Sequence, residues 1–484
     1  MFKNEIPNSN AQLQKYIFHQ FWNSFLAPYI DPAEYLTFLK LNGFSKAYLN
    51  GEKSFVRISG NIVKVVSIDD IQNFTTKFIR DTIPETPFLN DRNHPVWENH
   101  QKRVLNIFFG KHRNLIDEKF LCNMEVIEIS LPKDTPAAAI FNFQNGFVSV
   151  SKENIAFSNW EADNSFVWEH TLSPCSFYTD ESEGDFESFI NKVTDNNLQR
   201  KKSLSSIIGY SLHDYYTNST RVAFILTDDN PSLGNQGRTG KGVIVSAIKQ
   251  VRSTRIIDGK SFNPQNQFAY SAVEASDRII CFDDVDKSLH FDKLYNVING
   301  DYTIEKKYKN SVTVKKENSA KVIITANNGF FVSGESDFDR LFVFALYPAY
   351  NSKHKPFHDF KHEFFSSEWS QKQWNQFHTF MFRCVQLYLK EGIIRYDFPN
   401  YKKKCVSLLG SPELTDFLQE QSWENPIPCN HLYESFIKEY PEENLISMKK
   451  FGSCVRAFAN SFGYEFQEKC KVNKKRCYYL KKTK

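Results

Sequence analysis

The sequence predicts an α/β fold, because short apolar strands alternate along it with glycine-rich turns and helical patterns. An apolar strand beginning at Arg221 runs into a glycine-rich turn, and a helix is expected from about Gly242. Two further apolar strands, at 278–286 and 321–328, end in polar side chains, and another strand follows Arg340. These elements lie in the middle of the 484-residue chain, where the core of the fold is therefore expected.

The glycine-rich turn has the build of a loop that binds nucleotide phosphates. Glycines let the backbone curl so that successive N–H groups point at phosphate oxygens, and a lysine at the helix start adds positive charge. The candidate residues are Gly234, Gly237, Thr239, Gly240, Lys241 and Gly242. The loop departs from the standard pattern, since five residues instead of four separate Gly234 from Gly240, and Gly242 replaces the serine or threonine that holds magnesium. A glycine-rich turn between a strand and a helix can also simply connect the two elements without binding a ligand.

Polar side chains after the later strands supply the other parts of an ATP-hydrolysing site. Asp283 could hold hydrated magnesium while Asp284 orients the attacking water. Asn327, after the next strand, could sense the terminal phosphate. Arg340 could reach the nucleotide of a neighbouring subunit and neutralise charge in the transition state. We therefore expect ATP and Mg²⁺ as cofactors.

These motifs, in this order, resemble those of the superfamily 3 helicases of the AAA+ class, and within it the C-terminal helicase part of phage, plasmid and poxvirus primase-helicases. The residues that carry the resemblance are Gly237, Gly240 and Lys241 in the loop, the acids Asp283 and Asp284, Asn327, and Arg340. The resemblance implies an AAA+ P-loop ATPase core in a hexameric ring that translocates from 3′ to 5′. It also implies single-stranded and forked DNA as partners, with a separate primase or polymerase as a possible further partner.

A lysine-rich segment lies between the acidic strand and the strand that ends at Asn327. Residues 303–309 and 312–316 alternate as two strands around a turn, and their lysines include Lys306, Lys307, Lys309 and Lys315. In the resembling family such a hairpin grips the DNA backbone in a central channel, a task that suits lysine because phosphate contacts tolerate any base sequence. The alternative is a solvent-facing hairpin protected by its charges.

The carboxyl-terminal segment predicts a winged helix. Three helices, at 414–421, 431–439 and 447–462, precede two aromatic strands at 464–466 and 477–480. The third helix and the hairpin tip would present basic side chains to DNA, namely Lys449, Lys450, Arg456, Lys474 and Lys475. Winged helices also dock proteins, and a basic end can simply be a solubilising tail.

The amino-terminal part predicts an α+β accessory domain. Leu13, Ile17, Phe21 and Phe25 fall four residues apart, which predicts an amphipathic helix before Pro28, and strands follow at 55–59 and 62–67. The expected domains are residues 1–95 as this accessory domain, 96–205 as an assembly region before the ATPase, 206–400 as the AAA+ ATPase, and 405–484 as the winged helix.

Composition excludes several other classes of protein. The chain has 41% hydrophobic residues and a net charge of +4, with no apolar run long enough to cross a bilayer, so we expect a cytoplasmic protein with no membrane partner. The resemblance to phage and plasmid helicases implies that this cytoplasm is that of a bacterial host. Its nine cysteines are scattered singly and its twelve histidines lack ligand spacing, so no structural zinc is expected. A primase active site would be marked by a pair of carboxylates followed by a histidine motif, and the sequence contains no such pattern. We therefore predict that the protein unwinds DNA without synthesising primers.

The sequence thus predicts an ATP-dependent DNA helicase in the replication of a phage, plasmid or other mobile element. Two alternatives stay open. One is a replication initiator or loader whose ATP cycle switches assembly without processive unwinding, and the other is an NTPase of a defence system.

Overall fold

The computed structural model describes most of the chain, and its contacts divide the chain into two compact units. The described residues are 16–23, 29–49, 52–83, 85, 87–89, 95–110, 113–129, 132–160, 166–215, 221–229, 237–285, 294–307, 311–327, 340–398, 411–443, 446–467 and 470–482. The first unit comprises Met1–Pro132 and Asn159–Leu172, and the second comprises Lys133–Ser158 and Ser173–Lys484. The boundaries of the four predicted domains stay predictions.

The first unit combines a small sheet with helices, as the predicted α+β class requires. Its four-stranded sheet has the order β11-β5-β4-β3, antiparallel except that β11 runs parallel to β5. Short pairs β1-β2 and β6-β7 accompany it. The strands are β1 Trp22–Asn23, β2 Tyr29–Ile30, β3 Phe44–Leu49, β4 Glu52–Ser59, β5 Ile62–Val66, β6 Pro87–Leu89, β7 Pro95–Asn99 and β11 Val167–Trp168. The helices are α1 Pro32–Leu41, α2 Ile68–Thr82, α3 His100–Gly110 and α4 Glu118–Leu121.

The predicted amino-terminal helix is wrong for the part of it that the structure describes. Residues 16–21 are non-helical, and β1 pairs Trp22 with Ile30. Phe21 is buried in an aromatic core, with its ring centroid 4.7 Å from that of Phe38. Apolar residues four positions apart therefore do not form a helix here, because packing of this segment against α1 and α2 outweighs its local helical periodicity.

A five-stranded parallel sheet forms the centre of the second unit and confirms the predicted α/β class. Its order is β13-β14-β17-β12-β18. The strands are β12 Ala223–Asp228, β13 Thr254–Asp258, β14 Ile279–Asp283, β17 Lys321–Thr325 and β18 Leu341–Leu346. The predicted strand at 321–328 is thus β17. It lies between β12, which leads into the glycine-rich loop, and β14, which ends in the acids.

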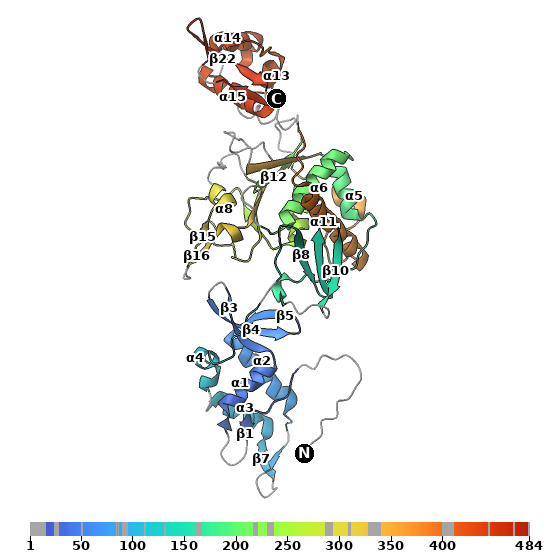
Figure 1. The fold of residues 1–484 in the computed structure, drawn as a ribbon, viewed down its shortest axis with the longest axis vertical. Coiled ribbons are helices and arrows are strands. Elements are labelled where there is room, and N and C mark those ends of the chain that lie inside the picture. Colours follow the sequence, from blue (N-terminus) through green and yellow to red (C-terminus); the bar gives the residue numbers. More distant parts are fainter. Residues whose placement is uncertain are drawn as a thin grey trace. The chain divides into compact units, whose positions relative to one another are not determined.

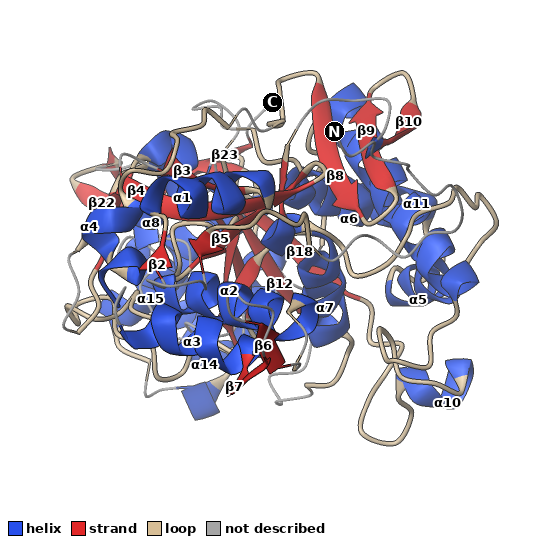
Figure 2. Cartoon of the chain, turned by 90° about the horizontal axis from the view of Figure 1, so that it is seen from below, coloured by secondary structure: helices blue, strands red, loops and turns tan. Residues whose placement is uncertain are grey.

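Helices and smaller sheets cover both faces of this sheet, and strands and helices alternate through the unit (Figures 1 and 2). On one face lie α5 Asp185–Val193, α6 Leu198–Leu212, α7 Lys241–Val251 and α11 Gln371–Glu391, together with the sheet of β8 Ala138–Phe143, β9 Gly146–Ser151 and β10 Ile155–Asn159. On the other face lie α8 Tyr295–Asn299 and the hairpin of β15 Tyr302–Ile304 and β16 Val312–Val314. A short helix, α10 Pro356–Phe360, follows β18.

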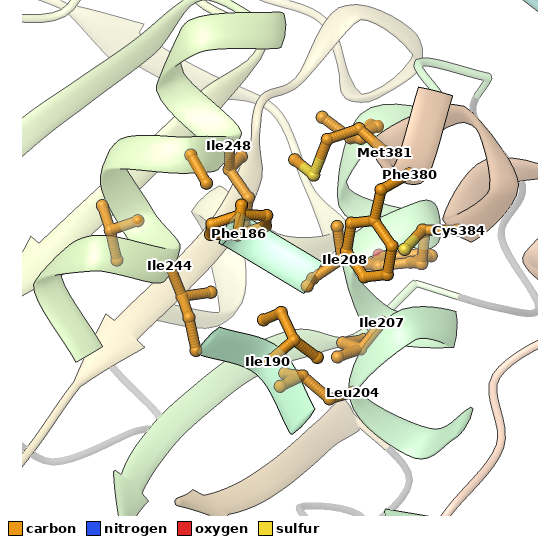
Figure 3. Packing of buried hydrophobic residues seen from close by; sticks show 14 of the residues in the cluster. Phe186, Ile190, Leu204, Ile207, Ile208, Ile244, Ile248, Phe380, Met381 and Cys384 are labelled. Atoms are coloured by element: carbon orange, nitrogen blue, oxygen red, sulfur yellow. The ribbon is translucent and has the colours of Figure 1, made fainter. Parts of the chain in front are cut away.

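The core on the first face is almost entirely aliphatic and aromatic. Figure 3 shows Ile244 and Ile248 of α7 facing Ile190 of α5 and Ile207 of α6, all of them buried. Because side chains from four helices interdigitate there, α7 and the loop before it are held on a rigid base. Strands β8 and β9 and helix α5, which lie in this layer, fall within the predicted assembly region 96–205.

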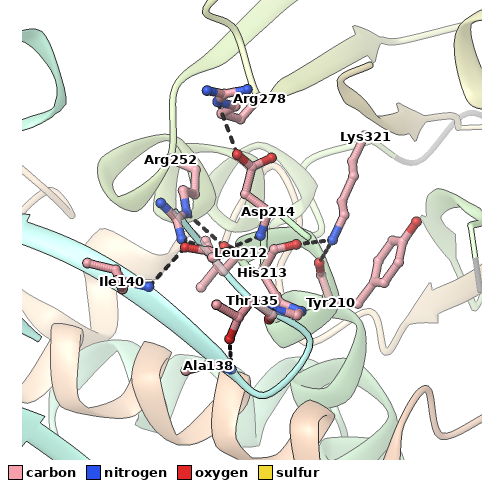
Figure 4. A network of polar contacts seen from close by, with 11 residues as sticks. Thr135, Ala138, Ile140, Tyr210, Leu212, His213, Asp214, Arg252, Arg278 and Lys321 are labelled. Carbon is pink, nitrogen blue, oxygen red and sulfur yellow. Dashed lines mark hydrogen bonds and ion pairs between the residues drawn. The ribbon is translucent and has the colours of Figure 1, made fainter. Parts of the chain in front are cut away.

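A buried polar network ties the elements together at the edge where the strands of the sheet begin (Figure 4). Asp134 accepts hydrogen bonds from the backbone N–H of Ile140 and of Asp214, at 2.9 and 2.7 Å, and pairs with Arg252 at 2.7 Å. Lys321, at the start of β17, donates to the backbone carbonyls of Tyr210 and His213. The ends of α6 and α7 are thereby fixed to the start of β17.

Residues 411–482 form a small group of elements with a hydrophobic core of its own. The three predicted helices are present, and their core includes Phe417, Phe436, Phe451 and Phe458. Strands β22 and β21 pair as a hairpin, β22 also pairs with β19, and β20 pairs with β23. The elements are α13 Pro412–Glu420, β19 Ile427–Pro428, α14 Cys429–Glu439, α15 Met448–Phe462, β20 Tyr464–Phe466, β21 Lys471–Val472, β22 Lys475–Tyr478 and β23 Leu480–Lys482.

Across the described ranges, no helix combines the length and apolar character needed to cross a bilayer.

Candidate functional site

The glycine-rich turn leads directly into helix α7, which begins at Lys241. Gly240 caps the helix with a φ of 108°, and a Cβ at this position would lie 2.7 Å from Cζ of Phe189 in α5. Glycine is therefore required twice, for the left-handed backbone and for the close approach of α5. The predicted Gly234 lies outside the described residues. The start of α7 consequently has the geometry expected of an anion-binding helix terminus.

Lys241 is held by a carboxylate that sequence reasoning missed. The Lys241 Nζ lies 2.7 and 2.6 Å from the two carboxylate oxygens of Asp228, the last residue of β12. The hydroxyl of Thr239 donates to the same carboxylate, and both members of the ion pair are buried. The signal available in the sequence was an acid at the end of an apolar strand, directly before the loop. Lys241 is thus positioned where the strand meets the loop, with a partner that an incoming phosphate could replace.

The remaining loop positions contribute backbone alone. Gly237 lies beside Asn327, since a Cβ at this glycine would be 3.6 Å from Oδ1 of Asn327. Gly242 is exposed, and a Cβ there would meet open space. The position after the loop lysine therefore offers no hydroxyl to a metal ion, as the sequence predicted.

The two predicted acids are organised by Thr325 and Asn327 at the end of β17. The Thr325 hydroxyl donates to Oδ1 of Asp283 at 2.6 Å and accepts from the backbone N–H of Asp284 at 2.7 Å. The Asn327 amide donates to Oδ1 of Asp284 at 2.6 Å. Sequence reasoning gave Thr325 no role, although it is the one polar residue within an apolar run. Asn327 therefore contacts Asp284 and lies beside the glycine-rich loop at Gly237.

The acid pair is compatible with a magnesium ion that is also bound by nucleotide phosphates. Asp283 is exposed at the end of β14, and Asp284 has a φ of 54°. Within the part of the chain that the structure describes, no group of three or more His, Cys, Asp or Glu residues could hold a metal ion by itself. Mg²⁺ is typically bound by one or two carboxylates together with water and phosphates, so the donor set around Asp283 fits it.

A second lysine, Lys260, lies at the acid pair and was also missed. Its ammonium pairs with Oδ2 of Asp284. Lys260 follows β13 on the chain and belongs to no motif, so no sequence pattern indicated it. Only the pairing of β13 with β14 brings the two residues together.

Arg340 lies at the opposite edge of the sheet from the loop. It directly precedes β18, in which Leu341 pairs with Ala223, whereas the Lys241 partner Asp228 pairs with Leu346. Five strand steps correspond to roughly 17 Å. The Arg340 guanidinium lies over the ring of Tyr295 in α8, 4.6 Å from its centroid. Arg340 is thus too far from the loop of its own chain to contact a nucleotide there.

The predicted hairpin is present as β15 and β16, but its strands are shorter than predicted, so Lys306, Lys307 and Lys315 lie beyond the strand ends. Acids accompany two of these lysines. Lys306 pairs with Glu274, and Lys315 pairs with Asp301 at 3.3 Å. The Lys307 Nζ lies 6.0 Å from the centroid of the Phe268 ring. Lys309 lies outside the described residues. The hairpin base is anchored by buried side chains of both strands, Tyr302, Ile304 and Val314.

The predicted basic residues of the carboxyl-terminal group are exposed. On α15, Lys449, Ser453 and Arg456 follow at intervals of four and three residues, so they share one exposed face, and Lys450 lies beside them. Lys474 and Lys475 lie at the turn between β21 and β22, where Lys474 has a φ of 64°. The two sets thus present positive charge from a helix face and from a hairpin tip.

Comparisons with known proteins add little to this geometry. Residues 233–340 match a family of unknown function (DUF5906), a span that runs through the loop, both acids and Arg340. The comparison with curated proteins found no match.

Among solved structures, the apo A form of the NrS-1 C-terminal region (CTR) is 12% identical, with a TM-score of 0.43 over 88% of this chain and 86% of that one. A second structure of that region is 11% identical, with a TM-score of 0.44 over 93% of this chain and 99% of that one. JCV helicase bound to a substituted acetamide is 10% identical, with a TM-score of 0.25 over 57% of this chain and 65% of that one. TM-scores this low do not establish a shared fold, so the function must be judged from the geometry of the site.

Proposed function

We propose that this chain is an ATP-dependent DNA helicase of the superfamily 3 type, with an AAA+ P-loop ATPase core. The observation that carries the proposal is the convergence of three polar groups at one edge of the parallel sheet. Asn327 after β17 donates to Asp284 after β14 and lies beside Gly237, in the loop that leads into Lys241 at the start of α7. A phosphate cradle beside a carboxylate that can orient water is the arrangement that nucleotide hydrolysis needs.

The site is completed by a second copy of the chain. Arg340 lies at the start of β18, and the loop of its own chain lies at the opposite edge of the sheet, where β18 ends. Arg340 can therefore act on ATP only across a subunit interface. A ring in which each Arg340 enters the next subunit is consistent with that placement, because closed heterologous interfaces generate rings. The hexameric state and the 3′ to 5′ direction follow from the family resemblance.

Two basic surfaces are assigned to DNA. The hairpin of β15 and β16 would grip single-stranded DNA through Lys306, Lys307, Lys309 and Lys315, and the exposed face of α15 with the β21-β22 turn would hold duplex DNA as a winged helix. Since Lys306 and Lys315 are already paired with acids, DNA phosphates must displace Glu274 and Asp301. This exchange would make DNA binding at the hairpin weaker than four unpaired lysines would suggest, because two ion pairs within the protein are lost.

The role in replicating a phage, plasmid or other mobile element, with a separate primase or polymerase, is the biological setting that the resemblance suggests. A replication initiator or loader is the alternative, and the exposed basic face of α15 favours it to the extent that duplex binding is its main task.

The decisive experiment measures ATP hydrolysis and strand separation on a 3′-tailed fork, with and without single-stranded DNA. The unmodified chain is compared with Lys241→Ala, which should lose both activities because the phosphates lose their cation, and with Lys249→Ala at the exposed end of α7 as the matched control. DNA-stimulated hydrolysis without strand separation would instead establish the initiator or loader. Hydrolysis that persists in Lys241→Ala would refute the site.

A further inference from the structure

The turn after β13 holds Lys260 beside the acid pair more firmly than an ordinary surface loop would. The backbone N–H of Gly259 donates to the carbonyl of Asp283 at 2.6 Å. A Cβ at Gly259 would lie 2.5 Å from Cγ2 of Val285 and 2.7 Å from that carbonyl, so only glycine allows the approach. The carboxylate of Asp258 accepts the backbone N–H of Lys260 at 3.2 Å. The main chain of Lys260 is therefore fixed next to the acids, while its long side chain remains adjustable.

Both oxygens of Asp284 are engaged by protein donors. Asn327 donates to Oδ1 at 2.6 Å, and the Lys260 ammonium pairs with Oδ2. An ionised carboxylate has about four acceptor sites, so these two donors leave room for a water but restrict the directions from which it can approach. Departure of the Lys260 ammonium would leave Oδ2 open to an attacking water.

The terminal phosphate of bound ATP is the anion that could draw Lys260 away. Asn327 donates to Asp284 and lies beside the loop residue Gly237, so the acid and the loop lie on either side of one side chain. The side chain of Lys260 is more than half exposed. An exposed lysine–carboxylate pair contributes at most about 1 kcal/mol, so the multiple negative charges of a phosphate group compete with it readily.

We propose that Lys260 is a further catalytic residue, which moves from Asp284 to the terminal phosphate when ATP binds. The inference rests on the proposed ATP hydrolysis and deepens it. In the step, the water oxygen forms a bond to the terminal phosphorus as the bond from that phosphorus to the bridging oxygen of ADP breaks. The water proton passes to Asp284, and the Lys260 ammonium keeps its protons and stabilises the charge on the transferred phosphoryl oxygens.

This assignment explains how one residue can couple binding to chemistry. When Lys260 is paired with Asp284, it occupies one oxygen of the acid that orients water. When ATP is bound, it supplies positive charge in the transition state. It would also add a cation to a loop whose Gly242 brings no hydroxyl for the metal ion.

The test compares Lys260→Ala and Lys260→Arg with the unmodified full-length chain, and uses Lys249→Ala as the matched control on an exposed surface. Two quantities are measured: the turnover number for ATP, and the affinity for fluorescent ADP with magnesium in the absence and presence of aluminium fluoride, which mimics the transferred phosphoryl group. Lys260→Ala should lower turnover by about 100-fold, the usual loss for one transition-state donor. It should weaken binding of the aluminium fluoride complex by a similar factor, with ADP affinity within about twofold, and Lys260→Arg should restore part of both.

Turnover that is unchanged or faster in Lys260→Ala would overturn the inference, since Lys260 would then only restrain Asp284. Equal weakening of ADP and of the aluminium fluoride complex would overturn it as well, because a purely structural role affects both. Failure of the proposed function is recognised separately: the unmodified chain would then not hydrolyse ATP, or Lys241→Ala would hydrolyse it normally.

Discussion

The two edges of the central sheet carry polar clusters of different kinds. At the edge where the strands end, the cations Lys241 and Lys260 are held by the side-chain carboxylates of Asp228 and Asp284. At the edge where the strands begin, Lys321 and Arg221 are held by backbone carbonyls. Arg252 is shared there between the carbonyl of Leu212 and the carboxylate of Asp134. The two clusters thus differ in how much of the positive charge is held by backbone carbonyls.

That difference separates binding from stability. A phosphate can replace a carboxylate as the partner of a lysine, because both are anions and the carboxylate side chain can turn away. A backbone carbonyl at a helix end cannot turn away in the same manner, because the helix fixes its direction. The strand-end cluster is therefore suited to exchange partners, whereas the strand-start cluster is suited to hold α6, α7 and β17 together.

Arg340 is the exception that tests this comparison most severely. It lies at the strand-start edge but is assigned to ATP hydrolysis, which is possible only if a second subunit brings its nucleotide there. Arg340→Ala should lower turnover by about 1,000-fold, as expected for the loss of an arginine finger. The measurement is steady-state ATPase of the variant alone and mixed with Lys241→Ala.

Mixing should restore activity, because some interfaces then combine an intact Arg340 with an intact Lys241. Arg395→Ala is the matched control, since that guanidinium also lies at the start of β18, donating to the carbonyl of Leu341. Mixtures that stay inactive would contradict an action between subunits, and the division between the two edges would then be incomplete.

Asp134→Ala should affect stability and leave nucleotide binding intact. It removes the acceptor for two backbone N–H groups and the partner of Arg252 in a buried site, a change expected to cost about 3 kcal/mol. Chemical denaturation gives the free energy of unfolding, and fluorescent ADP binding well below the transition gives the affinity. Asp134→Asn, which keeps one carbonyl acceptor, should lose less. A weaker ADP affinity in folded Asp134→Ala would show that the strand-start cluster reaches the nucleotide site.

The sequence predicted the elements at the strand-end edge better than the contacts between them. Apolar runs that end in polar residues predicted β12, β14, β17 and β18, because strand patterning and punctuation are local properties. Asp228, Lys260 and Thr325 had no assigned role, because their importance arises from neighbours that only the strand order supplies. The contacts of Asp134 with Arg252 and Asp214 span 118 and 80 residues, which no spacing rule relates.

The amino-terminal segment also shows that local sequence patterns cannot predict the effect of distant contacts. Its apolar spacing predicts a helix, yet Phe21 and Trp22 pack in extended form against a core whose aromatic residues come from α1 and α2. Local periodicity decides secondary structure where nothing stronger competes, and here the aromatic core competes.

Lys321 allows the smallest and most specific test of the strand-start cluster. Burial lowers the pKa of Lys321 to about 7, well below the ordinary value for lysine. Between the folded and unfolded pKa values the unfolded chain binds more protons, so the free energy of unfolding should rise with pH from about 7 towards 10, by at most about 1.4 kcal/mol per pH unit. Lys321→Met removes this contribution and keeps a side chain of similar length.

The measurement is the free energy of unfolding of both proteins in urea at pH 7, 8 and 9. The advantage of the unmodified chain over Lys321→Met should increase with pH, because the cost of burying the ammonium disappears as the proton leaves. Parallel curves would mean that Lys321 stays charged throughout, stabilised by the two carbonyls and by the Tyr210 ring, whose centroid lies 4.0 Å from Nζ. In that case backbone carbonyls stabilise the charged form of a buried lysine at the strand-start edge, as carboxylates do at the other edge. The two clusters would then differ only in whether a ligand can replace the partner of the lysine.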